Sequence, residues 1–149
     1  MLGGDLPGSN PLYRQTPRVE EFMLPSYLFP ESVARASGEG PAVEAGVLRG
    51  KLAVATLGIT RTLEQEGLEV SIWGSSDQQE WGDRPLARFP QKFYCGLYSI
   101  LLNLSPYPDM RYLQVRWTMS RWDRREQVPL FGFYVFAEES GSRVRAAVA

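Results

Sequence analysis

Apolar and polar residues alternate along two stretches of the sequence, residues 68–73 (LEVSIW) and 111–119 (RYLQVRWTM). A period of two places successive side chains on opposite faces of a β-strand, so each stretch predicts a strand with one face against a core. No glycine or proline interrupts 111–119, and we expect that strand to be central in its sheet. The residues predicted to point inward are Leu68, Val70, Ile72, Leu113, Val115, Trp117 and Met119.

Other apolar segments also favour strands. They cover residues 47–57, with 59–64 as a continuation or a second strand, and then 85–89, 93–104 and 130–137. In the first of these, Leu48, Leu52 and Val54 are predicted to share one face. The run 93–104 could instead be a buried helix, but its aromatic and β-branched residues and its internal glycine favour a strand.

About seven strands with turn signals roughly every 8 to 12 residues predict an all-β fold, an antiparallel two-sheet β-sandwich of jelly-roll type. A barrel is the alternative. The predicted sandwich domain spans residues 47–139, and residues 140–149 are expected to form a flexible tail. The last strand is apolar on both faces, which predicts that both faces are covered.

Residues 1–46 are predicted to form an extended, proline-rich N-terminal arm. They hold six of the eleven prolines, which lack a backbone donor and favour extended geometry. Residues 30–37 could form one short helix between a proline and a glycine. We expect the arm to dock on its own sandwich or, alternatively, on a neighbouring copy, because it carries apolar anchors that a solvated linker would not tolerate. These anchors are Phe22, Leu24, Tyr27 and Phe29.

The chain contains no histidine and a single cysteine. The lack of imidazole excludes Ser-His-Asp and Cys-His catalysis within this chain, as well as the metal sites that need histidine. Cys95 lies in an apolar run and is expected to be a small buried hydrophobe. Asp77, Glu80 and Asp83 could offer oxygen ligands to calcium, but they lack EF-hand spacing and favour a solvated turn. We therefore expect no enzyme, no cofactor and no metal site.

The formal net charge is −1 and no long block of like charge occurs, which argues against nucleic acid as a partner. The N-terminal residues have neither the basic nor the apolar segment of a secretion signal, and no stretch reaches the roughly 20 apolar residues of a membrane span. We expect a cytoplasmic protein, or part of a particle assembled in the cytoplasm, without a membrane span.

Two groups of residues are candidates for binding a ligand or a partner. Trp81 follows the turn after the strand 68–73, whereas Arg121, Trp122 and Arg124 follow the strand 111–119. Guanidinium planes and indole rings can stack on sugars or fill a pocket on a protein partner. The alternative is that the loop arginines pair with nearby acids and Trp117, on the preceding strand, belongs to the core. We favour a core position for Trp117 and leave Trp122 open.

The order of these motifs resembles the discoidin or galactose-binding-like family of jelly-roll sandwiches. The similar parts are LEVSIWGSSDQQEW, the short LARF segment, RYLQVRW and the closing FGFYVFAEE, all within residues 49–139. The resemblance implies a β-sandwich and a ligand-binding module, often for carbohydrate or lipid head groups. The chain departs from many secreted members in lacking their framing cysteine pair, so we extend the resemblance to the fold and not to a ligand.

These features predict a non-enzymatic structural or interaction protein, a homo-oligomer or a partner of another protein, that assembles through its N-terminal arm as in phage particles or other ordered assemblies. The alternative is a carbohydrate-binding module. It would use Trp81 and Trp122 as aromatic platforms and Arg121 or Arg124 as donors to sugar hydroxyls.

Overall fold

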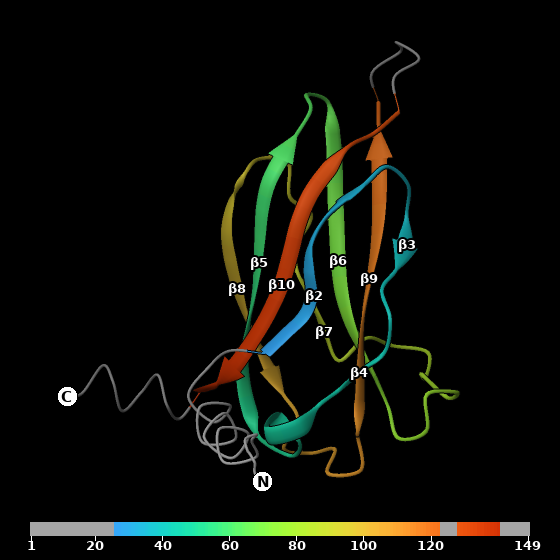
Figure 1. Ribbon diagram of the computed structural model, residues 1–149, viewed down its shortest axis with the longest axis vertical. Coiled ribbons are helices and arrows are strands. Elements are labelled where there is room, and N and C mark those ends of the chain that lie inside the picture. Colours follow the sequence, from blue (N-terminus) through green and yellow to red (C-terminus); the bar gives the residue numbers. More distant parts are fainter. Residues whose placement is uncertain (1–25, 123–127, 141–149) are drawn as a thin grey trace, which may run out of the picture.

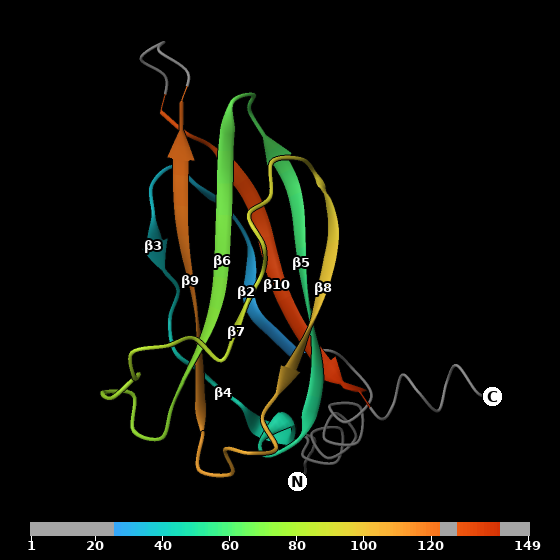
Figure 2. The same ribbon diagram turned by 180° about the vertical axis from the view of Figure 1, so that it is seen from behind.

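A computed structural model describes residues 26–122 and 128–140 of the chain. It forms two antiparallel sheets packed face to face, which confirms the predicted two-sheet β-sandwich (Figures 1 and 2). One sheet has the strand order β2-β10-β5-β8, and the other has the order β3-β9-β6-β7 with β4 also paired to β9. The strands are β2 (Ser26–Ala34), β3 (Gly38–Glu39), β4 (Val43–Glu44), β5 (Leu52–Thr62), β6 (Glu66–Ser75), β7 (Ala87–Arg88), β8 (Gly96–Asn103), β9 (Tyr112–Arg121) and β10 (Phe131–Glu139), and a 3-10 turn, η1, covers Gly46–Leu48.

The core lies between the two sheets and confirms the alternation in β6 and β9. The three inward residues of β6 and the first two of β9 are fully buried, and they face the inward side of β5 and β10. Trp117 and Met119 are only half-buried, because they lie towards the end of β9. β9 pairs with β6 along its length and with β3 and β4 on its other side, so it is central in its sheet as predicted.

The structure of residues 26–34, strand β2, differs from the predicted N-terminal arm. Residues 26–34 form an edge strand paired with β10, so the helix predicted over 30–37 is wrong, and the sandwich includes β2, β3 and β4, which precede Val47. Phe29 is buried in the chain's own core, and Tyr27 lies on the outer face of the sheet. An edge strand with irregular pairing tolerates a proline, which explains why Pro30 does not end the strand. Phe22 and Leu24 lie outside the described residues.

In β5, Leu52 and Val54 share one face as predicted, but Leu48 lies in η1 and outside the strand. Ala53, Ala55 and Leu57 point into the core, whereas Leu52 and Val54 lie on the outer face. The strand is apolar on both faces, so alternation alone did not distinguish them. Residues 59–62 continue β5 without a break, and the run 93–104 is a strand, β8, rather than a helix.

Two further expectations concern the burial of Cys95 beside β8 and of the two faces of β10. Cys95, just before β8, is exposed rather than buried. The inner face of β10 is fully buried, but its outer residues Tyr134 and Phe136 are only half-buried. The expectation that both faces are covered therefore fails for the part of the chain that the structure describes. In the same ranges, 26–122 and 128–140, no helix is long and apolar enough to cross a membrane.

Candidate functional site

Three aromatic rings meet on the outer face of the four-stranded sheet. Tyr27 on β2 lies 5.8 Å from Phe136 and 6.1 Å from Tyr134, both on β10, measured between ring centroids. Tyr134 and Phe136 stack with an interplanar angle of 12°. Gly58 on β5 allows this arrangement, because any side chain there would collide with the Tyr134 ring. The rings thus extend the apolar surface from β2 across β10 onto β5.

Aliphatic side chains continue this surface across β5 and β8. Leu97 pairs with Gly58, and Leu101 pairs with Val54. Leu97, Leu101 and Tyr27 are 69%, 59% and 57% exposed, and it is their place in one patch rather than their exposure singly that is informative. We call this surface the outer apolar face, and its members are Tyr27, Leu52, Val54, Leu97, Leu101, Tyr134 and Phe136. Contiguous exposed apolar surface of this kind marks interaction sites.

The middle of β5 carries no charge on the outer apolar face, although Glu138 on β10 lies opposite Val54. Thr56 lies in the middle of β5, and its hydroxyl is hydrogen-bonded to the hydroxyl of Ser99 on β8 at 3.1 Å. That bond satisfies both hydroxyl groups within the surface. Charged residues occur at its margin, where Lys51 pairs with Glu139 at 3.8 Å. An apolar centre with a charged margin is typical of a protein interface.

The loop after β6 lies at one end of the sandwich and holds Trp81. Its first turn is fixed by Ser75, whose hydroxyl accepts the N–H groups of Asp77 and Gln78, and by Asp77, whose carboxylate accepts those of Gln79 and Glu80. The N–H of Glu80, then that of Gln79, and then the Ser75 hydroxyl lower the pKa of Asp77 below its ordinary value. The carboxylate of Asp77 is therefore used to shape the turn.

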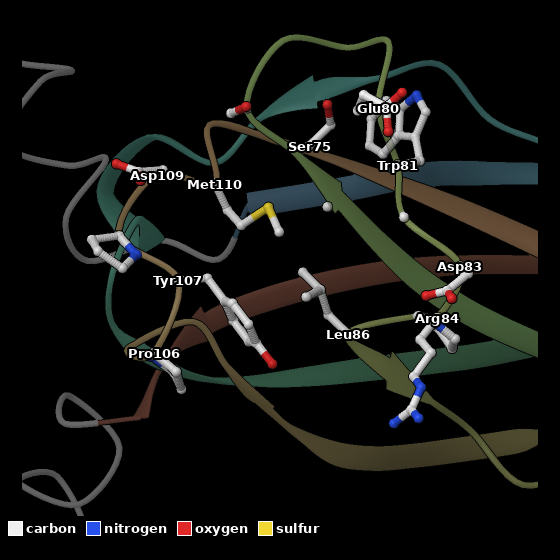
Figure 3. A pocket seen from close by; sticks show the side chains of 15 residues that line it. Ser75, Glu80, Trp81, Asp83, Arg84, Leu86, Pro106, Tyr107, Asp109 and Met110 are labelled. Atoms are coloured by element: carbon white, nitrogen blue, oxygen red, sulfur yellow. The ribbon is translucent and has the colours of Figure 1, made fainter.

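An open pocket of about 650 Å³ lies between this loop and the segment 106–110 that precedes β9 (Figure 3). Leu86, Tyr107 and Met110 point towards its middle, and polar side chains, among them Arg84, line its rim. Gly74 forms part of its lining, and an added Cβ there would come within 2.5 Å of Leu86 and 3.0 Å of Met110. The pocket therefore combines an aromatic wall and an apolar floor with several charged groups.

Arg116 connects this end of the molecule to the outer face of the second sheet. Its guanidinium carbon lies 4.3 Å from the ring centroid of Trp73 and 5.8 Å from that of Trp81. Nε donates to Gln114 at 2.9 Å and lies 3.5 Å from a carboxylate oxygen of Glu39. The sequence singled out Trp81, but only the fold brings it together with Arg116 and Trp73.

The other predicted binding residues lie at the opposite end of the sandwich. Ser75 at the end of β6 pairs with Tyr112, whereas Glu66 at its start pairs with Arg121. Trp81 lies 5.8 Å from Arg116 in the middle of β9, whereas Trp122 follows the end of β9, six residues or about 20 Å further along, so the two tryptophans do not share a site. Trp122 is 54% exposed. Arg124 lies outside the described residues.

Trp122 borders a second open pocket, of about 570 Å³, which is also lined by Phe93, Tyr94 and Glu64. The centroids of the Trp122 and Phe93 rings are 5.9 Å apart in an edge-to-face arrangement. Arg121 does not take part in this pocket. Its guanidinium is paired with the buried carboxylate of Glu66, which makes it part of the fold rather than a donor to a ligand.

Within residues 26–122 and 128–140, no group of three or more Cys, Asp or Glu side chains is placed to hold a metal ion. The fold and these surfaces define an all-β sandwich with an exposed apolar sheet face and an aromatic pocket at one end. No family model, curated protein or solved structure matches the chain. The resemblance to the galactose-binding-like family stays a prediction.

Proposed function

We propose that this protein is a non-enzymatic interaction protein that assembles with copies of itself through the outer apolar face. The observation that carries the proposal is the high exposure of Leu97, Leu101 and Tyr27 on one continuous sheet face. Burying such residues is worth roughly 1.5–3 kcal/mol per side chain, so contact with another molecule would gain substantial free energy. Assembly into an ordered particle is consistent with this role.

A second copy is the occupant that best fits the chemistry of this face. The middle strand, β5, carries no charge between Leu52 and Gly58, so two identical faces can meet there without like-charge repulsion. Sheets in β-sandwiches commonly pack face to face at about 10 Å, and the aromatic trio of Tyr27, Tyr134 and Phe136 supplies the large side chains that dominate such contacts. The N-terminal residues lead directly into Tyr27, so Phe22 and Leu24 are close in sequence to the same interface.

A charge at the centre of the face tests this proposal. Val54→Lys places an ammonium group beside Leu101 and opposite Glu138 on β10, which favours folding of the single chain but opposes burial in an interface. Thr118→Lys is the matched control, because Thr118 is exposed on the other sheet. We expect Val54→Lys to weaken self-association at least about tenfold in sedimentation velocity, a loss of about 1.4 kcal/mol, and Thr118→Lys to leave it unchanged. Equal association of both variants would contradict the proposal.

Carbohydrate binding at the Trp81 pocket is a second candidate function. It is favoured by the pocket of about 650 Å³, in which Trp81 and Tyr107 offer ring faces beside Glu80, Asp83 and Arg84 as hydrogen-bonding groups. Trp81→Ala should abolish any glycan-array signal. Trp122→Ala should keep it, because Trp122 lies at the opposite end of the sandwich. A blank array with the unaltered protein would exclude glycans of the array as ligands.

A further inference from the structure

β8 forms one edge of the four-stranded sheet and pairs with β5 on one side. It bounds the sandwich in both views, and no described strand lies along its other side (Figures 1 and 2). Its eight residues, GLYSILLN, contain no charged residue and no proline. Within residues 26–122 and 128–140, the strand therefore presents a row of backbone donors and acceptors at an edge that no other strand covers.

The other described edge strands carry features that discourage pairing. β2, at the opposite edge of the same sheet, contains Pro30 and Glu31 and pairs irregularly with β10. β3, β4 and β7, at the margins of the second sheet, have two residues each. Natural sheets protect their edges by short strands, charges, prolines and irregularities. Among the described edge strands, β8 alone has none of these, which makes it suited to pair with another strand.

The hydrogen bonds between β5 and β8 show which groups of β8 face its free edge. The amide of Leu104 donates to the carbonyl of Lys51 at 2.9 Å. Because successive residues direct their N–H and C=O groups to alternate sides, the even-numbered residues of β8 bond to β5. Leu97, Ser99 and Leu101 direct theirs to the free edge. The same three side chains are exposed on the outer face.

We propose that β8 pairs with β8 of a second copy, antiparallel about a two-fold axis at Ser99. This inference rests on the self-association in the proposed function and adds a second contact between the copies. In this register Ser99 lies opposite Ser99 of the second copy, and Leu97 lies opposite Leu101. By symmetry the Leu97–Leu101 pair occurs twice, which gives three pairs in all. In each pair the donors and acceptors of both residues face the edge, so the pair exchanges two backbone hydrogen bonds. The leucine pairs also bring apolar side chains together on one face.

Edge pairing and face packing are compatible in one assembly. A two-fold axis perpendicular to the sheet keeps the outer apolar faces of both copies on the same side, so pairing at β8 doubles the area of that face. Two such pairs packed face to face give a tetramer with two kinds of contact. Disrupting either contact alone should then leave dimers.

Disulfide trapping tests the register directly. In a background of Cys95→Ser, which removes the exposed thiol, Ser99→Cys places two thiols opposite each other. Hydrogen-bonded antiparallel pairs have Cα atoms about 5.5 Å apart, within the range of about 4.4–6.8 Å that a disulfide spans. In Leu101→Cys the two cysteines are about 13 Å apart along the strands, beyond disulfide reach. We expect covalent dimers from Ser99→Cys and none from Leu101→Cys. The opposite result, or no cross-link from either, would overturn the proposal.

A proline at the same position also tests the edge, and Ser99→Ala controls for the loss of the hydroxyl bond to Thr56 on the outer apolar face. Ser99→Pro removes an amide hydrogen that faces the free edge and leaves the bonds of the even-numbered residues to β5 in place. We expect the mass of the assembly in sedimentation velocity to fall by half, whereas Ser99→Ala keeps it. Circular dichroism checks that both variants are folded.

Combining this test with Val54→Lys separates the two contacts. If Ser99→Pro keeps the full mass while Val54→Lys lowers it, the β8 pairing is wrong and the face contact stands. If Ser99→Pro lowers the mass while Val54→Lys does not, the face contact is wrong and the edge pairing stands.

Discussion

Glu66 and Arg121 form a buried ion pair between the first residue of β6 and the last residue of β9, with 3.2 Å between Oε1 and Nη1. The side chain of Glu66 has no exposed area. Its carboxylate also accepts the backbone N–H groups of Leu63 and Leu130 and the hydroxyl of Thr62. One side chain thus joins the β5–β6 turn, the end of β9 and the approach to β10.

Removing this carboxylate should strongly destabilise the fold. Glu66→Ala removes the carboxylate that pairs with the buried Arg121 side chain and that accepts two backbone amides, so we expect a loss of about 3–5 kcal/mol. Glu69→Ala is the matched control, because Glu69 is exposed on the same strand, and it should cost less than about 0.5 kcal/mol. Urea denaturation of both variants measures the difference. Similar midpoints would show that the ion pair does not hold the strand ends together.

Trp117 should contribute far more to stability than its neighbour Arg116. The Trp117 ring packs against Phe29 and Phe133 at centroid distances of 4.9 and 5.5 Å, and its Nε1 donates to the carbonyl of Ala36 at 2.8 Å. We expect Trp117→Ala to cost about 3 kcal/mol, near the lower end for a large aromatic residue because the ring is half-exposed. Arg116→Ala loses an outward contact with Trp73 and should cost less than about 1 kcal/mol. Thermal melts compare the two, and the reverse order would refute the assignment of faces in β9.

The sequence predicted the faces of β6 and β9 because each has one polar side, and the sandwich followed from such strands. It placed Leu52 and Val54 on one face of β5 but did not show that this face is the outer one, since alternation cannot distinguish two apolar faces. β2 was missed because its partner, β10, lies about a hundred residues away in the chain. The separation of Trp81 from Trp122 depends on the antiparallel pairing of β6 with β9, which no local pattern specifies.

The Asp77 turn should respond to acid. The pKa of Asp77 lies below its ordinary value of 3.8, chiefly because the carboxylate accepts the N–H of Glu80, and then that of Gln79. A lowered pKa in the folded state means that the ionised group stabilises the fold above the unfolded pKa and loses that contribution as the pH falls through the folded pKa. An NMR titration should give a midpoint below 3.8 for Asp77, with the Gln79 and Glu80 amide shifts following it. A midpoint at or above 3.8 would contradict this assignment.

Deleting residues 1–25 should preserve the sandwich and weaken self-association. The deletion ends before β2, so Leu28 and Phe29 remain in the core, whereas it removes Phe22 and Leu24. Deleting residues 1–34 instead removes β2, and we expect that variant to unfold or to lose several kcal/mol of stability. Light scattering reports the mass of the first variant, and circular dichroism reports the fold of both. An unchanged mass after deletion of 1–25 would remove the N-terminal residues from the interface.

Hydroxyl-radical footprinting of the unaltered protein at low and high concentration tests the central claim, because it reports which side chains the assembly covers. We expect oxidation of Tyr27, Leu97 and Leu101 to fall as the concentration rises. Oxidation of Tyr94, which is 75% exposed and lies outside the outer apolar face, should stay constant. If Tyr27, Leu97 and Leu101 are oxidised as fast at high concentration as at low, the outer apolar face is not the site of assembly. This holds whether the protein associates through another surface or stays monomeric.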